Sequence, residues 1–243
     1  MKIKKTLYKL LGDTIEYKDL GDNFILFKHN KPGTYIRKGA KIRVRKDQSV
    51  FIVKDNVLYS VLRPGTYYLL PDVFPELKDF FEKGLKSVVD VDLYMLNQKP
   101  FANKSWSNKE AVTIKDKELK HVQIRAFGTY SFRIEDAYKF VSEIFINKRK
   151  YFTCNILVCL GGYVAKAVAE SMQEAKPDIA EIIDSYKTFE SAALKKLKKE
   201  GLSIGVDFID VCIDNLSVPM VVQQFIEDMK WRDIESRYKE TEA

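Results

Sequence analysis

Residues that commonly transfer protons or bind metals are scarce in this chain of 243 residues. It contains two histidines, His29 and His121, which lie far apart in the sequence. Carboxylates and lysines can also act as general bases, so the scarcity of histidine does not exclude catalysis by itself. The sequence contains no Walker loop and no GxGxxG, GxSxG or HExxH motif. We therefore predict no enzyme activity, no catalytic residue, no metal site, no cofactor and no small-molecule substrate.

Two further groups of residues have side chains that can take part in chemistry. Asp207, Asp210 and Asp214 form an acidic cluster, but strand alternation puts Asp207 on the opposite face unless a bulge intervenes. We interpret them as edge charges that discourage pairing between sheets. The cysteines are odd in number, lie in apolar stretches and form no CxxC pair, which favours small buried side chains in a reducing compartment. They are Cys154, Cys159 and Cys212.

The clearest chemical signal is a run of cations that contains no acid. In its centre, Lys41, Arg43 and Arg45 alternate with Ile42 and Val44, so one face of the strand packs and the other carries positive charge. A solvated face on a chain of formal net charge +7 remains an open alternative to an anion-binding surface. The run consists of Lys28, Lys31, Arg37, Lys38, Lys41, Arg43, Arg45 and Lys46.

This charge would attract an acidic membrane leaflet, where each lysine or arginine contributes about 1 kcal/mol. The residues expected to hold the protein reversibly at such a surface are Lys2, Lys4, Lys5, Arg37, Lys38, Lys41, Arg43 and Arg45. The same cations would neutralise the phosphates of a nucleic acid. Few aromatic residues lie between them and no nucleic-acid-binding motif is present, so nucleic acid is the less favoured partner.

The elements that position these residues follow from hydrophobic periodicity. Residues 3–15 predict a short basic amphipathic helix that packs on the domain or on a neighbouring subunit, because its apolar stripe is short for lipid insertion. Strands dominate residues 24–95, with a helical turn at 77–82. The segment QSVFIVKDNVLYSVLRPGTYYLLP (48–71) predicts a β-meander, in which Pro64-Gly65 forms a type II turn.

The second half alternates strands with helices. Strand pairing is expected at 122–134, followed by helices at 137–145, 151–173 and 179–197 and a strand at 204–216. Gly201 is expected to end the third helix, and Pro219 to begin a final one. The apolar stripe of that final helix would pack on its own domain or on a partner. It consists of Val222, Phe225, Ile226 and Met229.

The order of these motifs resembles the SPFH (band 7) domain of stomatins, prohibitins and flotillins. The supporting segments are 48–71, LKHVQIRAFGTYSFRIEDAYKF (119–140), which looks like a pair of strands, and EGLSIGVDFIDVCIDNLSVP (200–219). The middle segment is similar to soluble, virion-core-protein-like members. Those members carry Trp-Gly-Thr where this chain has Trp106-Ser107-Asn108, so this chain departs from the pattern there.

The resemblance implies an α+β fold, with an antiparallel strand-rich first half followed by strands packed with helices. We expect an N-terminal helix (1–20), two subdomains (21–118 and 119–218) and a C-terminal helix (219–243). It also implies a non-catalytic scaffold that forms homo-oligomers and organises proteins at a membrane surface, in a membrane-stress response. The alternative is a basic nucleic-acid-binding or virion-core structural protein.

Location follows from the apolar segments. No signal peptide is expected, since no sustained apolar core follows the N-terminal lysines. The most apolar run, Ile156 to Ala165, is about half of the roughly 20 residues that span a bilayer. Stomatins and prohibitins carry their own membrane segment, so this chain departs from those proteins in this respect. We expect a cytoplasmic protein that is peripheral to the membrane, with lipid or an integral membrane protein as its partner.

Overall fold

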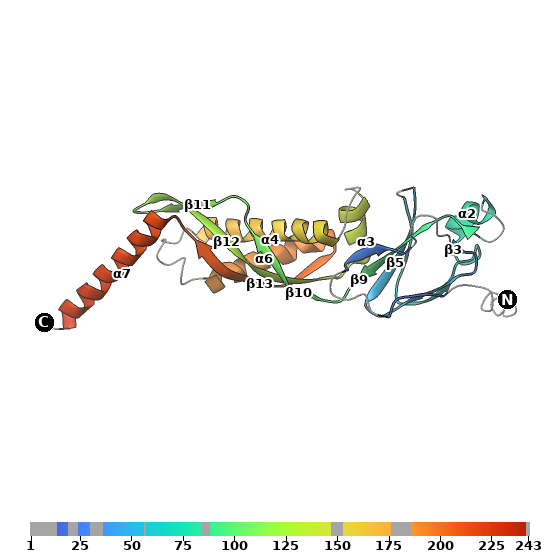
Figure 1. Cartoon of the computed structure of the whole chain (residues 1–243), viewed down its shortest axis with the longest axis horizontal. Helices are drawn as coiled ribbons and strands as arrows, with labels where there is room; N and C mark the ends of the chain where they lie inside the picture. Colours follow the sequence, from blue (N-terminus) through green and yellow to red (C-terminus); the bar gives the residue numbers. More distant parts are fainter. Residues whose placement is uncertain are drawn as a thin grey trace. The chain divides into compact units, whose positions relative to one another are not determined.

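A computed structural model describes residues 14–18, 24–29, 36–55, 57–83, 88–146, 153–175 and 186–241. The elements drawn in Figure 1 form two compact units, each assembled from segments that are separate in the sequence. Unit 1 comprises Met1–Phe101, Arg133–Ile156 and Ser203–Asp207, and unit 2 comprises Ala102–Phe132, Leu157–Leu202 and Phe208–Ala243. The α+β class with mainly antiparallel sheets is confirmed.

Within its described residues, unit 1 contains two larger sheets and one short ribbon. The four-stranded sheet has the order β2-β9-β5-β6, and the three-stranded sheet has the order β1-β4-β7. β3 (Ile36–Arg37) pairs with β8 (Val88–Val89) in the ribbon. The strands of the two sheets are β1 (Thr14–Glu16), β2 (Leu26–Lys28), β4 (Lys41–Val44), β5 (Gln48–Lys54), β6 (Val57–Leu62), β7 (Gly65–Tyr68) and β9 (Asp92–Asn97).

Both sheets contribute to one hydrophobic core. Ile42 and Val44 of β4 belong to the same buried cluster as Val50 and Ile52 of β5. Phe51, on the other face of β5, is also completely buried, so this central strand is covered on both faces. A strand that is buried on both sides is apolar along its whole length, which agrees with the sequence FIV at 51–53.

The predicted meander is wrong, although its strands exist. β5 and β6 pair as a hairpin, but β7 pairs with β4 and lies in the other sheet. The chain crosses between sheets at Pro64-Gly65, where Gly65 has a φ of 159° and already begins β7. A type II turn needs a φ near +80° at this position, so the predicted turn does not form.

The N-terminal part of the chain differs from its prediction where the structure describes it, because Thr14–Glu16 form the strand β1. Ile15 is buried in β1, which pairs in parallel with β4, instead of ending a helix. The rest of the predicted helix, residues 3–13, lies outside the described residues. The helical turn near 77–82 is confirmed as the 3₁₀-helix η1 (Pro75–Leu77) followed by α2 (Lys78–Lys83).

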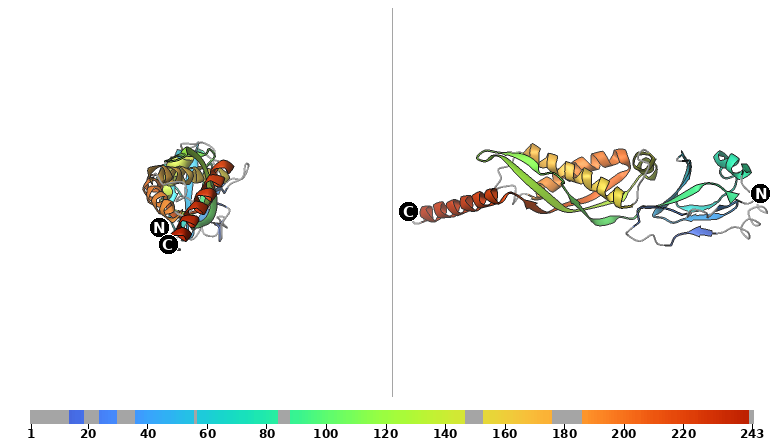
Figure 2. Two further views of the ribbon diagram at one scale, coloured as in Figure 1. Left: turned by 90° about the vertical axis from the view of Figure 1, so that its left-hand side faces the viewer. Right: turned by 45° about the horizontal axis from the view of Figure 1, so that its top comes forward.

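Unit 2 is a sheet covered on one face by two helices. β12 (Lys120–Ile134) pairs on one side with β10 (Phe101–Ser107) and β11 (Val112–Asp116), and also pairs with β13 (Val206–Ser217). Figures 1 and 2 show α4 (Thr153–Ala175) and α6 (Tyr186–Ile204) along the same face. The strand pair expected at 119–134 is one continuous strand, because Gly128 continues the ladder without a turn.

Gly128 is required by a close approach between strands. A Cβ atom there would overlap the backbone carbonyl of Cys212 in β13 and lie 3.0 Å from the amide nitrogen of Asp214. The buried indole of Trp106, on β10, donates a hydrogen bond from Nε1 to that same carbonyl oxygen at 3.0 Å. Trp106 therefore connects β10 to β13 across the position that only glycine can occupy.

The helix boundaries follow local capping. Asp136 caps α3 (Ala137–Phe140), accepting a hydrogen bond from the Lys139 amide, and the π-helical turn η2 (Val141–Ile146) follows. α6 continues through Gly201 to Ile204, so the end predicted at Gly201 is wrong. Gly205 ends the helix with a φ of 72°, a left-handed conformation that favours glycine. Ile179, Ile182 and Ile183 lie outside the described residues.

The last helix, α7 (Met220–Thr241), begins directly after Pro219, as predicted. Its bounds place the whole helix in unit 2. Within the described ranges, none of the helices combines the length and the hydropathy needed to traverse a lipid bilayer.

Candidate functional site

The cations at the centre of the predicted run occupy one face of β4. Ile42 and Val44 point into the core of unit 1, with exposures of 0% and 4%. Lys41 and Arg43 consequently point outward, and Arg45 follows at the end of the strand. The predicted alternation is therefore confirmed. We call Lys41, Arg43 and Arg45 the cationic face.

An acidic residue that the local sequence does not reveal lies beside this face. The parallel pairing of β1 with β4 puts Glu16 opposite Arg43. Its carboxylate accepts a hydrogen bond from Nη2 of Arg45 at 2.7 Å and lies 3.8 Å from Nη1 of Arg43. Burial acts to raise the pKa of Glu16, but the Arg45 hydrogen bond and the charges of Arg43, Arg45 and Lys18 lower it overall.

One carboxylate is thus shared between two arginines, and the face keeps an excess of positive charge. The guanidinium side chains of Arg43 and Arg45 remain 55% and 43% exposed. Glu16 is 18% exposed and lies between them. The arrangement holds the arginines in place without neutralising both, which suits reversible contact with an anion.

Lys46 directly follows Arg45 and is exposed, whereas Lys28, Arg37 and Lys38 lie outside β4. Lys28, on β2, forms an ion pair with Asp92 at 2.7 Å. Arg37 belongs to the β3–β8 ribbon, and the Lys38 ammonium lies 5.8 Å from the centre of the Phe81 ring. Lys31, Lys2, Lys4 and Lys5 lie outside the described residues, so their contribution stays a prediction.

The groups that could carry out acid–base chemistry are dispersed. His29, in unit 1, lies 2.7 Å from the hydroxyl of Tyr17, and burial lowers its pKa. His121 is exposed on β12, in unit 2. Over the parts of the chain that the structure describes, no three His, Cys, Asp or Glu side chains are grouped so as to hold a metal ion.

The alternation predicted for the aspartates of β13 is interrupted in the structure. The buried residues Phe208 and Val211 are three positions apart, whereas regular alternation would separate them by an even number. The strand is therefore irregular between them, and outward-pointing residues have odd numbers before this point and even numbers after it. Asp207, Asp210 and Asp214 all avoid the buried face as a result. Asp207 is paired with Arg133 at 3.1 Å.

The cysteines differ in part from the prediction of buried side chains. Cys159 and Cys212 are half-buried free thiols. Burial raises the pKa of Cys212 to about 11, and the nearby Asp210 carboxylate, 3.3 Å from its sulfur, adds to the shift. A thiol with this pKa is protonated at neutral pH and is a poor nucleophile.

The predicted partner stripe of α7 is partly used within unit 2. Ile226 is 3% exposed, while Val222, Phe225 and Met229 are half-buried. Sequence reasoning missed other exposed apolar residues of this helix, among them Trp231 and Ile234, which are 66% and 43% exposed. Their separation of three positions on a polar stretch is a weak signal, because charged residues surround both.

Comparisons with known proteins add a family match. The sequence profile described as the SPFH domain-Band 7 family matches residues 26–234. The chain is also similar to the uncharacterized protein YdjI of Bacillus subtilis (strain 168), at 25% identity over 150 residues. That alignment covers 60% of this chain and 46% of YdjI, so it spans less than half of the relative's length.

Proposed function

The chain belongs to the SPFH domain-Band 7 family, and from this premise we propose a non-catalytic scaffold that self-associates and organises proteins at an anionic membrane surface. Proteins of this family are generally non-catalytic scaffolds and commonly oligomerise, which supports the general role. The membrane part is supported by one observation: the outward face of β4 and its end carry three cations, and a single carboxylate, that of Glu16, pairs with two of them. A role in membrane stress enters this proposal through the family resemblance.

The charge on the cationic face sets the strength of the expected contact. Three cations and one carboxylate leave an excess of two positive charges. At about 1 kcal/mol for each charge near an acidic leaflet, this contributes roughly 2 kcal/mol, or about a 30-fold increase in binding. A single copy therefore binds weakly, whereas an oligomer that presents several such faces gains strongly from multivalency.

The positive charge of the cationic face also suggests which leaflet of a membrane the protein would contact. The cytoplasmic leaflet carries the anionic lipids that attract basic segments. We accordingly place the protein in the cytoplasm, peripheral to the membrane. An integral membrane protein would be a second partner, with Val222, Phe225 and Met229 of α7 contributing to the contact.

Vesicle co-sedimentation of the full chain tests this proposal. We expect binding to phosphatidylcholine vesicles only when phosphatidylserine is included, and we expect added salt to weaken it, since salt screens exposed charges. The combined variant Lys41→Gln, Arg43→Gln and Arg45→Gln should lose most of this binding. Equal binding to neutral and acidic vesicles would overturn the proposal.

A matched control separates this face from the general charge of the protein. Lys115, Lys120 and Arg125 are exposed cations of unit 2. Their combined replacement by glutamine removes the same charge and should leave most of the vesicle binding in place. If both triple variants lose binding equally, the cationic face has no special role.

A further inference from the structure

A mostly apolar groove of about 800 Å³ lies along α4 in unit 2. Gly161, Gly162 and Ala165 line it on the helix side, and β10, β11 and the segment between them form the other wall. A Cβ atom added at Gly162 would meet no heavy atom within 4 Å, and Val158 is 62% exposed. Within the ranges described for unit 2, this side of α4 is therefore open.

The dimensions of the groove fit a helix. Its lining extends along α4 from Leu157 to Gln173, which corresponds to about 24 Å at a rise of 1.5 Å per residue. Small residues in the floor allow a second helix axis to approach closely, because interaxial distance depends on the side chains at the contact. An amphipathic helix of about four turns would fill such a groove along its length.

α7 carries apolar residues that are left uncovered, away from the side on which Ile226 is buried. Met220, Trp231 and Ile234 are 76%, 66% and 43% exposed. At 100° per residue, Met220 and Ile234 lie within about 60° of Trp231, and the stretch from Met220 to Ile234 is about 21 Å long. In Figures 1 and 2 the helix runs away from α4, so it does not enter the groove of its own chain.

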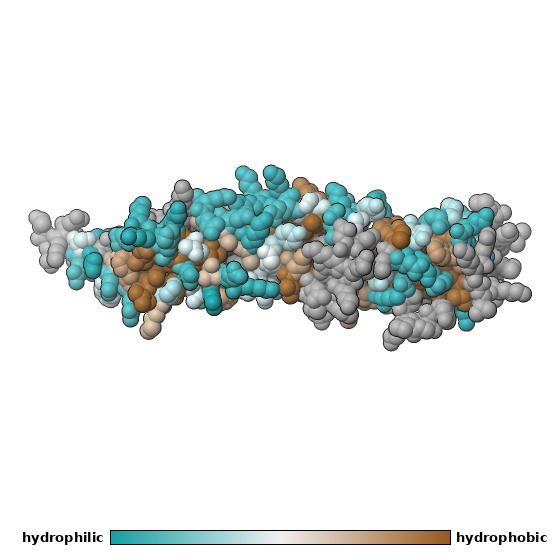
Figure 3. Space-filling view, turned by 90° about the horizontal axis from the view of Figure 1, so that it is seen from above, coloured by the Kyte–Doolittle hydropathy of each residue, from teal (hydrophilic) through white to brown (hydrophobic). Residues whose placement is uncertain are grey.

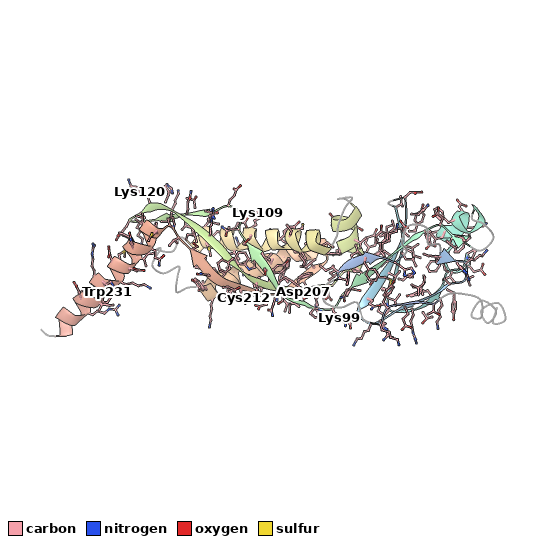
Figure 4. All side chains as sticks on the ribbon, viewed as in Figure 1. Lys99, Lys109, Lys120, Asp207, Cys212 and Trp231 are labelled. Atoms are coloured by element: carbon pink, nitrogen blue, oxygen red, sulfur yellow. The ribbon has the colours of Figure 1, made fainter. Side chains whose placement is uncertain are left out.

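Two further views, Figures 3 and 4, show the surface around α7 and the position of Trp231 on this helix. Figure 3 shows apolar side chains gathered near the start of α7, and Figure 4 shows Trp231 far along the helix from the groove residue Lys109. Figure 4 shows no other described element of unit 2 beside Trp231. A large exposed tryptophan flanked by charged residues is typical of an interface anchor.

The charges on the two surfaces are complementary. Glu227 and Asp228 lie within about 60° of Trp231 around α7, whereas Lys230 and Arg232 are displaced by about 100°. The groove presents Lys109 and Lys166, together with one acid, Glu110. Lys166 is 3.7 Å from both Glu170 and Glu200, so its charge is shared but it remains 61% exposed.

We infer that α7 of one copy of this chain docks in the α4 groove of a second copy, with Trp231 as its anchor. This inference rests on the self-association part of the proposed function and names the surfaces that carry it. Helix and groove are different surfaces, so the contact is heterologous and continues from copy to copy until a ring closes. Each copy then contributes its own cationic face.

Light scattering of the full chain over a range of concentrations tests this interface. Gly162→Arg places a long side chain in the open groove, and Trp231→Ala removes the anchor. Each variant should weaken association by about 30-fold or more, as expected for the loss of an interface hot spot. The matched controls, Ser191→Arg on the exposed side of α6 and Arg232→Ala beside the anchor, should associate like the original chain.

Mixing the two variants makes the test specific. The α7 of the Gly162→Arg chain is intact, and so is the groove of the Trp231→Ala chain, so one complete interface can form in the mixture. We expect the mixture to form one-to-one dimers while each variant alone stays monomeric, which also shows that both variants are folded.

The contrary results are distinct. If Trp231→Ala weakens association but Gly162→Arg does not, the helices pair with each other and the groove inference is overturned. If both variants associate like the original chain, the inference fails while a self-associating scaffold stands. An original chain that stays monomeric at high concentration overturns both the inference and self-association.

Discussion

The strand junction at Gly128 provides the sharpest prediction about the fold. In Gly128→Ala, the new methyl group would overlap the carbonyl of Cys212 and press on the amide of Asp214. Both neighbours are backbone atoms held in a sheet, so they cannot move aside like a flexible side chain. The β12–β13 junction must separate, and the hydrogen bond from Trp106 to the Cys212 carbonyl is lost or weakened.

The size of the effect follows from these two terms. Overpacking in a well-packed core costs roughly 1–3 kcal/mol, and leaving the buried indole N–H without its acceptor costs roughly another 1–3 kcal/mol. We therefore expect Gly128→Ala to lower the free energy of unfolding by about 2–6 kcal/mol. With an m-value of roughly 3 kcal/mol/M, the urea midpoint falls by about 0.7–2 M.

Gly162→Ala is the matched control for this measurement. It makes the same substitution in the same unit, but in the interior of α4 where the new methyl group meets no atom within 4 Å. Alanine is favoured over glycine in a helix, so this variant should gain about 0.5–1 kcal/mol. Urea unfolding followed by circular dichroism compares the two. A Gly128→Ala protein that unfolds within about 0.5 kcal/mol of the original would refute the close approach.

Two smaller predictions concern a helix cap and a thiol. Asp136→Ala removes the side chain that accepts the Lys139 amide at 3.1 Å, and should lower the free energy of unfolding by about 1 kcal/mol in urea, whereas Asp136→Ser should restore most of it; equal losses would contradict the capping role. Cys212, with a pKa of about 11, should react with iodoacetamide about ten times faster for each pH unit between 7 and 10, because its thiolate fraction rises tenfold per unit. Mass spectrometry of the modified peptide measures this rate, and a plateau near pH 9 would contradict the raised pKa.

Local pattern was sufficient for features that depend on neighbouring residues. The alternation of Ile42 and Val44 with cations predicted both the buried and the outward face of β4. Helical spacing and Pro219 predicted the start of α7. In each case the side chains involved are within one strand or one turn, so the period of the sequence carries the information.

Features that depend on long-range pairing could not be obtained in this way. Glu16 reaches Arg43 only because the three-residue strand β1 pairs in parallel with β4, and so short a strand has little periodic signal. Likewise, Tyr67 pairs with Ile42 in place of a residue of β6, a choice of sheet that the Pro-Gly turn does not encode. The change of parity between Phe208 and Val211 is also invisible in composition.

The end of α6 illustrates a competition between two candidate signals. Gly201 and Gly205 are both followed by apolar residues, and either could have ended the helix. The carbonyl of Gly205 accepts hydrogen bonds from the amides of Glu135 and Asp136, and a Cβ atom there would overlap the Asp136 backbone. Tertiary contact with the start of α3 therefore decides the position.

The most direct test of the central claim is the binding of Glu16→Gln to phosphatidylserine-containing vesicles. This change adds one positive charge to the cationic face and keeps an oxygen that can accept the Arg45 hydrogen bond. One charge near an acidic leaflet is worth about 1 kcal/mol, so we expect binding to tighten by about fivefold. Glu118→Gln, which makes the same change in charge on unit 2, should leave binding nearly unchanged. If Glu16→Gln binds no more tightly than the original chain, or if both variants gain equally, the cationic face is not the surface that meets the membrane.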